Sequence, residues 1–275
     1  MKIVRCLLLF PVLALFAAAY PLSASAAEPA RIAPVLDSIV AKKEVVVGTA
    51  ASMPPLNMTM KDGQIAGLEI DLARTIADGL GVKLTIKPIV FSGLIAALEA
   101  RQVDMVLSAM TITPGRNLRV AFVGPYFASG KSILTKKSLV ESLSEVSKIN
   151  NPDKVLVALK GSTSQLFAEK IFPKAKLLLA EDYDQGINMV REGKVQAMVA
   201  DMPICQVAAY RYPEAELATL RNPISYEPLG IAVPPNDPLL VNWLQNYLNA
   251  LEKDGTMKMM MEKWFGDGSW VKQLK

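Results

Sequence analysis

Short aliphatic runs alternate with amphipathic helical patterns along most of this chain, and this alternation limits its possible folds more than any other feature. Three consecutive valines at 45–47 form one strand-like run, and Val-Leu-Val at 155–157 forms another. Between residues 68 and 80, leucine and isoleucine recur every four positions with charged residues on the opposite face, and Gly81 closes the pattern. Strands separated by helices in this way predict an α/β fold with largely parallel sheets.

The N-terminal segment has the composition of a targeting sequence. Two basic residues precede an apolar run over residues 6–19, and small residues crowd positions 23–27. This order predicts a secretory signal peptide over residues 1–26 and a mature chain that begins near Ala27. The apolar run is shorter than the roughly 20 residues that a membrane span needs, although an uncleaved anchor is the alternative.

Composition excludes several kinds of function. Removing Lys2 and Arg5 with the signal peptide lowers the formal charge from +4 to +2, which argues against a nucleic-acid partner. The chain has no histidine, so neither a histidine-based catalytic triad nor the commonest metal ligand is available. After cleavage only Cys205 remains, and it cannot form an intrachain disulfide. We therefore expect no metal, no cofactor and a buried, inert thiol.

A series of short motifs follows Glu44. The most specific is Met-Thr-Ile-Thr-Pro-Gly-Arg at 110–116, followed by Gly-Pro-Tyr at 124–126. In this order and at this spacing, the motifs make the chain resemble the periplasmic amino-acid-binding proteins of ABC importers, solute-binding protein family 3. The other motifs are Gly-Thr at 48–49, Met-Pro-Pro at 53–55, Ile-Ala-Gly-Leu-Glu-Ile-Asp-Leu-Ala at 65–73, Val-Asp-Met-Val at 103–106, Gly-Ser-Thr at 161–163 and the apolar strand that ends at Asp201.

The resemblance implies a fold and a role. The fold would be the α/β, two-lobed periplasmic-binding-protein fold of type II, with two crossover strands and a cleft between the lobes. Lobe 1 would comprise residues 44–134 plus 230–275, and lobe 2 residues 135–229. The protein would be a periplasmic monomer without catalytic residues and not embedded in the membrane. It would bind an amino acid and deliver it to the permease of an ABC transporter.

The ligand's carboxylate needs a permanently charged anchor, which a planar guanidinium supplies. The resemblance assigns this role to Arg116, at the end of the motif Thr-x-Thr-x-x-Arg. It assigns a second grip on the carboxylate to the turn at Ser162 and Thr163, where a helix begins and its backbone N–H groups attract an anion. The alternatives are a surface ion pair for Arg116 and an ordinary helix cap at the turn.

The ammonium group of the ligand needs a carboxylate and neutral acceptors. The resemblance assigns the carboxylate to Asp201, the hydroxyl to Thr111 and a backbone carbonyl to Ala109. A helix N-cap is the alternative role of Asp201, because Met202 and Pro203 follow it.

The side-chain pocket departs from the pattern of basic-amino-acid binders in this family. Ala50 stands where an acidic residue is often found, and Met53 occupies the place of an aromatic residue. Phe91 is the remaining candidate for an aromatic wall. These residues favour a neutral ligand, either apolar or small, although the methionines are equally explained as packing residues.

Two other functions are compatible with the same fold. Cyclohexadienyl dehydratases are similar in family and fold, and their chemistry needs a carboxylic acid near the ligand. Glu181, Asp182 and Asp184 are the candidates for such an acid. A periplasmic sensory module that hands its ligand to a receptor is the other alternative.

Overall fold

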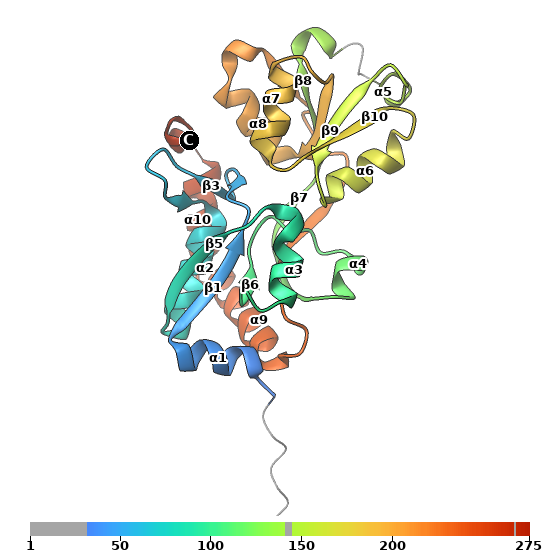
Figure 1. Ribbon diagram of the computed structural model, residues 1–275. Helices are drawn as coiled ribbons and strands as arrows, with labels where there is room; N and C mark the ends of the chain where they lie inside the picture. The colour runs from blue at the N-terminus through green and yellow to red at the C-terminus, as the bar shows by residue number, and fades with distance from the viewer. Residues whose placement is uncertain (1–31, 141–144, 267) are drawn as a thin grey trace, which may run out of the picture. The chain divides into compact units, whose positions relative to one another are not determined.

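The computed structural model describes residues 32–140, 145–266 and 268–275, so the predicted signal peptide lies outside the described residues. Two five-stranded mixed sheets organise the chain (Figure 1). In the first sheet, the first three strands in the order given below are parallel, and the fourth strand runs antiparallel to both of its neighbours. Its order is β5 (Lys83–Pro88), β1 (Glu44–Thr49), β6 (Met105–Val106), β13 (Glu227–Val233) and β7 (Ala121–Ser129).

The second sheet repeats this combination of parallel and antiparallel strands. Three strands are parallel, and the remaining two run antiparallel to their neighbours. Its order is β10 (Lys176–Ala180), β9 (Val155–Leu159), β11 (Ala197–Asp201), β8 (Lys131–Lys136) and β12 (Leu217–Thr219). Every residue of β11 is buried, as expected for an interior strand of a sheet covered on both faces.

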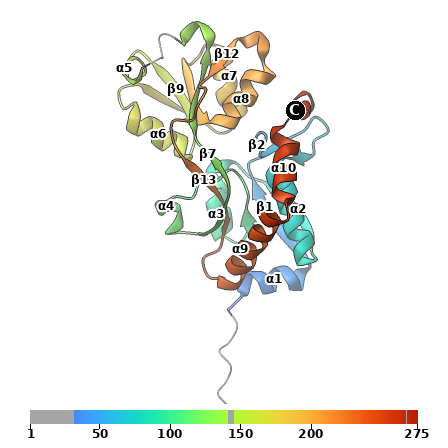
Figure 2. The ribbon, with the colours of Figure 1, turned by 180° about the vertical axis from the view of Figure 1, so that it is seen from behind.

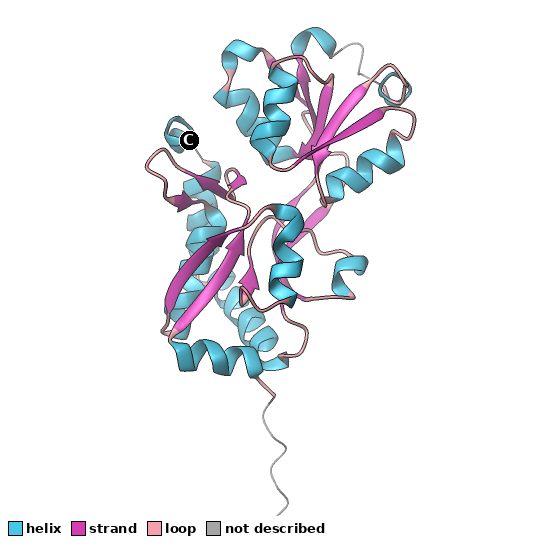
Figure 3. Cartoon of the chain, in the orientation of Figure 1, coloured by secondary structure: helices cyan, strands magenta, loops and turns pink. Residues whose placement is uncertain are grey.

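Helices cover the sheets, and the predicted α/β class is confirmed. Figure 3 shows α7 and α8 on one face of the second sheet and α6 on the other. In Figure 2, α10 lies beside α2, against which it packs. Within the described residues, no helix is both long and apolar enough to span a bilayer. The helices are α1 (Pro34–Lys42), α2 (Leu68–Leu80), α3 (Leu94–Glu99), α4 (Pro114–Asn117), α5 (Val146–Ile149), α6 (Thr163–Ile171), α7 (Tyr183–Arg191), α8 (Met202–Arg211), α9 (Pro238–Lys253) and α10 (Thr256–Phe265).

Shorter elements complete the fold. A small three-stranded antiparallel sheet lies between β1 and α2 in the sequence. Its strands are β2 (Ser52–Met53), β3 (Asn57–Thr59) and β4 (Ile65–Ala66), and the 3-10 helices are η1 (Phe91–Gly93), η2 (Lys137–Leu139), η4 (Pro213–Ala215) and η5 (Ser269–Gln273).

Helix α2 shows how the sequence pattern becomes structure. Leu68, Leu72 and Ile76 recur every four residues and are completely buried. Gly81 ends the helix in the left-handed conformation and donates its N–H to carbonyls of the last turn, which is the usual role of a C-terminal glycine. The helix predicted over 68–80 is therefore confirmed.

The chain changes sheet at two places. Strand β7 ends at Ser129 in the first sheet, and β8 begins at Lys131 in the second. The chain returns to the first sheet with β13, which begins at Glu227. Both exchanges depend on strand pairing, and an aliphatic run in the sequence does not reveal which strand it pairs with. At Gly130, a Cβ atom would lie 2.2 Å from the backbone oxygen of Ser225, so the two connections approach closely there.

Candidate functional site

Arg116 projects from α4, a short helix that follows β6. The hydroxyl of Thr113 accepts a hydrogen bond from the N–H of Arg116, and proline occupies the first helical position. A threonine cap followed by proline is a common sequence signal for the start of a helix. The backbone of Arg116 is therefore fixed by a cap, which directs its side chain from a rigid turn.

The guanidinium of Arg116 joins segments from both sheets. Its Nη1 donates to the backbone oxygen of Thr111 at 2.8 Å, and its Nη2 donates to the backbone oxygen of Gly161 at 3.1 Å. The group lies over the ring of Phe91, 5.5 Å from its centroid, within range of a cation–π contact. Burial lowers the pKa of Arg116, while the nearby charges of Glu227 and Asp201 oppose this shift. These partners differ from the surface ion pair considered as the alternative.

The hydroxyl groups of Thr111 and Thr163 meet in the same region. Their oxygen atoms are 3.2 Å apart, and the hydroxyl of Thr163 donates to Oε2 of Glu227 at 3.0 Å. Thr111 is held by a β-bridge to Leu229 of β13. Thr163 is the first residue of α6.

Ser162 caps α6 with its side chain. Its hydroxyl accepts from the N–H of Gln165 at 3.1 Å and donates to the backbone oxygen of Leu159 at 2.6 Å. The alternative of an ordinary helix cap is thus correct for the side chain of Ser162. Its hydroxyl both accepts and donates a hydrogen bond within this turn.

Asp201 lies at the N-cap position of α8, but its side chain makes no capping hydrogen bond. Its Oδ1 accepts instead from Nζ of Lys131 at 2.7 Å. The same Nζ lies 3.4 Å from Oε2 of Glu227. The Lys131 side chain is completely buried, whereas those of Asp201 and Glu227 are each 10% exposed.

Sequence reasoning missed both Lys131 and Glu227. A lysine followed by four uncharged residues at the start of a strand is a weak sequence signal, because lysine is rarely buried without a partner. Its partner could not be read from the sequence, since the pair depends on the antiparallel register that places Lys131 opposite Asp201.

Ala109 and Met53 are both buried. Ala109 has a positive φ of 48° and donates its N–H to Oε1 of Glu69 at 2.6 Å. Met53 is buried, and its sulfur lies 3.9 Å from the hydroxyl of Ser108. The alternative of an ordinary packing residue fits this environment of Met53.

Glu69 anchors the loop that carries Ala109. It is completely buried, and its carboxylate accepts hydrogen bonds from the hydroxyl of Tyr126, the N–H of Ala109 and the side-chain amide of Asn57. Burial raises the pKa of Glu69, and the three donors partly offset the shift. The network connects α2, β7 and β3 with the loop that carries Ala109.

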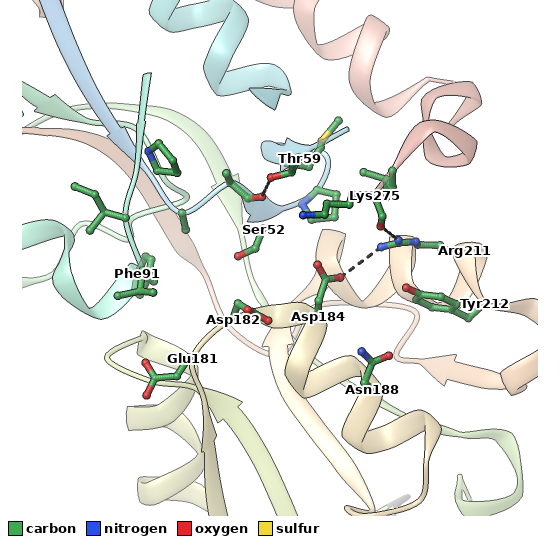
Figure 4. Close-up of a pocket in the computed structure, with 18 residues that line it drawn as sticks. Ser52, Thr59, Phe91, Glu181, Asp182, Asp184, Asn188, Arg211, Tyr212 and Lys275 are labelled. Carbon is green, nitrogen blue, oxygen red and sulfur yellow. Dashed lines mark hydrogen bonds and ion pairs between the residues drawn. The ribbon is translucent and has the colours of Figure 1, made fainter. Parts of the chain in front are cut away.

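A cavity of about 550 Å³ is lined by residues of both sequence regions that form the sheets (Figure 4). Phe91 belongs to its wall, together with Ala50, Ile89 and Val90 from the segments after β1 and β5. The opposite wall carries Glu181, Asp182 and Asp184 together with Arg211, as the labelled side chains in Figure 4 show.

The three acidic residues of this cavity have partners. Glu181 pairs with Lys160 at 2.7 Å, and Asp182 caps α7 by accepting from the N–H of Gln185. Asp184 lies 3.4 Å from Arg211. Burial raises the pKa of Asp184 even though the charge of Arg211 acts in the opposite direction.

Arg116 and Thr163 line a separate cavity of about 370 Å³, and Phe91 belongs to the walls of both cavities. The structure thus brings Arg116, Thr111, Thr163 and Phe91 into one contact region, and the nearby charge of Asp201 acts to raise the pKa of Arg116. Among the described residues, no cluster of three or more cysteine, aspartate or glutamate side chains could hold a metal ion.

Comparison with known proteins identifies the class of this fold. Residues 45–267 match the bacterial extracellular solute-binding proteins, family 3, so the chain belongs to that family. A crystal structure of a putative ABC-transporter binding component from Wolinella succinogenes, complexed with lysine, is 33% identical with a TM-score of 0.80; the alignment covers 84% of this chain and 99% of that one. The predicted two-lobed, type II periplasmic-binding-protein fold is confirmed by this likeness.

Two relatives differ in their functions. The arginine-binding protein 1 of an Escherichia coli ABC transporter is 26% identical over 82% of this chain and 92% of its own length. The cyclohexadienyl dehydratase of Pseudomonas aeruginosa is 25% identical over 83% of this chain and 85% of its own length. Family membership alone therefore does not separate binding from catalysis.

Proposed function

We propose that this protein binds a neutral α-amino acid in the periplasm and delivers it to the permease of an ABC importer, without catalysing a reaction. One observation carries the proposal. The guanidinium of Arg116 contacts backbone oxygens of both Thr111 and Gly161, which belong to segments of different sheets. A carboxylate that replaced these neutral acceptors would form stronger, charge-assisted hydrogen bonds with the same fork.

The bound amino acid would bridge the two lobes. Its carboxylate would face Arg116 and the first turn of α6, and its ammonium group would face Asp201. We place the exchange between lobes at Gly130 and Tyr226, so that lobe 2 comprises residues 131–226, because the strands change sheet at these positions. Binding would then favour the arrangement of lobes in which both sets of contacts form.

The lining of the larger cavity supports a neutral ligand. Ala50, Ile89, Val90 and Phe91 give one wall no charge. The acidic side chains of the opposite wall have cationic or backbone partners. This arrangement differs from what a lysine or arginine side chain requires, which is a carboxylate left available for it.

A ligand screen followed by one substitution tests the proposal. Thermal-shift measurements with the twenty amino acids should yield at least one hit, and calorimetry should then give its Kd. Arg116→Ala should weaken that binding by about 2–5 kcal/mol, or roughly 30-fold or more. The matched control is Arg74→Ala, which removes an exposed arginine paired with Asp71 and should leave Kd unchanged. Unchanged affinity in Arg116→Ala would refute the carboxylate assignment.

The dehydratase remains a second candidate because Asp184 lines the larger cavity and has a raised pKa, as a general acid requires. Incubation with prephenate or arogenate distinguishes the two functions. We expect no aromatic product. If product does form, and Asp184→Asn abolishes it, the protein is an enzyme on this fold.

A further inference from the structure

Lys131 is a buried charge for which amino-acid binding gives no direct role. Its side chain is completely buried, so it cannot itself contact a ligand in the cleft. It opens β8, and the antiparallel pairing of β8 with β11 places it opposite Asp201. Its backbone N–H donates to the hydroxyl of Ser225, and its backbone oxygen accepts from the N–H of Ile224. The backbone of Lys131 is therefore held both by its pairing with β11 and by its hydrogen bonds to residues 224 and 225.

Glu227 provides a second carboxylate beside Asp201. Its Oε2 lies 3.4 Å from Nζ of Lys131 and accepts from the hydroxyl of Thr163. Its Oε1 accepts from the hydroxyl of Ser225 at 3.0 Å. A hydrogen bond to Thr163 thus connects Glu227 with the predicted binding residues.

The charges of this group cancel. Arg116 and Lys131 contribute two positive charges, and Asp201 and Glu227 contribute two negative charges, so the sum is zero. Without Lys131 the group would carry a net charge of −1 in a region shielded from solvent, where the field of one charge is poorly screened. Such a region would attract a ligand with a net positive charge.

We infer that Lys131 determines the charge specificity of the site, since its positive charge, placed against both Asp201 and Glu227, offsets one of their two negative charges and leaves one to oppose a single ligand ammonium group. This inference rests on the proposed function. It accounts for a site that prefers amino acids without net charge, although the acidic residues near it would by themselves favour arginine or lysine.

The test compares affinities for two ligands of similar size, glutamine and arginine, in the full-length mature protein. Lys131→Met should shift the ratio of the two Kd values toward arginine by roughly tenfold or more. Lys131→Met combined with Glu227→Gln restores the charge sum of zero and should return the ratio to within about threefold of the original. Glu227→Gln alone gives the group a charge of +1 and should shift the ratio away from arginine.

The control removes an exposed lysine that pairs with no residue of the cavity walls. Lys83, at the start of β5, pairs with Glu44, and the two side chains are 76% and 37% exposed. Lys83→Met changes the total charge as Lys131→Met does, but solvent screens it, so the ratio should move by less than about threefold.

Each outcome is decisive. If Lys131→Met lowers both affinities by the same factor, the lysine has only a structural role and the inference is wrong. If Lys131→Met does not fold, Glu227→Gln and the double variant supply the same comparison. If the ratio stays constant in all variants while Arg116→Ala still weakens binding by roughly 30-fold or more, the charge inference fails and the proposed function stands. If no amino acid binds the unsubstituted protein, both fail together.

Discussion

The hydroxyl oxygen atoms of Thr111 and Thr163 lie 3.2 Å apart, although 52 positions separate the two residues in the sequence. One follows β6 of the first sheet, and the other opens the helix after β9 of the second. The contact continues through Glu227 and Lys131 to Asp201. A chain of polar groups thus connects Thr163, which the resemblance assigns to the carboxylate end of the ligand, with Thr111 and Asp201, which it assigns to the ammonium group.

Removing either hydroxyl should weaken ligand binding. Thr111→Val and Thr163→Val should each raise the Kd of the amino acid found by the screen by roughly fivefold, because a neutral hydrogen bond contributes about 1 kcal/mol. Because the two groups contact each other, the double variant should lose about 0.5 kcal/mol less than the sum of the two single losses. Calorimetry on the four proteins gives this coupling.

Thr75→Val is the matched control for these variants. Its hydroxyl bonds to the backbone oxygen of Asp71 within α2, away from the candidate site, so its removal should not alter Kd. Strict additivity of the two losses at Thr111 and Thr163 would show that this contact has no part in binding.

Structural features that have a local sequence signal could be predicted from the sequence. Contacts that depend on pairing between distant strands could not. Thr113 and Pro114 mark the start of α4, and the structure confirms this start. The pairing of Lys131 has no such local signal, because its partner Asp201 is 70 positions away and meets it only through strand register. The residues at which the chain changes sheet depend on the same kind of pairing.

A motif can also assign a role to a residue without showing what its side chain contacts. The sequence offers an N-cap as the alternative role of Asp201. In the structure its carboxylate makes no capping hydrogen bond and instead accepts one from Lys131. Met53 stands at an expected wall position and is nevertheless buried. In both cases tertiary packing, which has no local sequence signal, decides which partner the side chain meets.

Glu69 should make folding stability depend on pH in an unusual direction. Its pKa in the folded protein is raised above the ordinary value of 4.5, so the folded state holds the proton more strongly than the unfolded state does. As the pH rises from 4.5 through the folded-state pKa, the protein should lose the stability that neutral Glu69 contributes. Glu69→Gln keeps a neutral side chain at all pH values and should not show this loss.

Denaturant unfolding between pH 4.5 and 8 measures the effect as the difference in unfolding free energy between the original protein and Glu69→Gln. This difference should fall as the pH rises. Asn57 can accommodate the substitution by turning its amide, because its Oδ1 has no partner in the structure. Glu69→Ala should be less stable than Glu69→Gln at every pH, since it leaves the three donors unpaired. A difference independent of pH would contradict the assignment.

Asp237 should contribute more to stability than an ordinary helix cap. Its Oδ1 accepts from the N–H of Leu240 at the start of α9, and its Oδ2 accepts from the N–H groups of Val35 and Leu36 at the start of α1. The side chain is completely buried. Asp237→Ala should therefore lower the unfolding free energy by about 2–4 kcal/mol, because it removes a cap and leaves buried donors unpaired.

The comparison for Asp237→Ala is Asp182→Ala, which removes the exposed cap of α7. That change should cost about 1 kcal/mol. Urea denaturation of both variants gives the two values, and equal losses would mean that the contacts of Asp237 with α1 contribute nothing.

Cys205 should be unreactive in the folded protein. The thiol is buried, and burial raises its pKa from 9.0 to about 12. At pH 8 this shift lowers the reactive thiolate fraction by about a thousandfold relative to a free thiol, and burial also blocks access by a reagent. A thiol-specific reagent should therefore label none of the native secreted protein and one thiol per chain in denaturant. Cys205→Ala should abolish the denatured signal. Two thiols per denatured chain would show that Cys6 is still present and that the predicted signal peptide is not removed, whereas rapid labelling of the native protein would show that Cys205 is accessible.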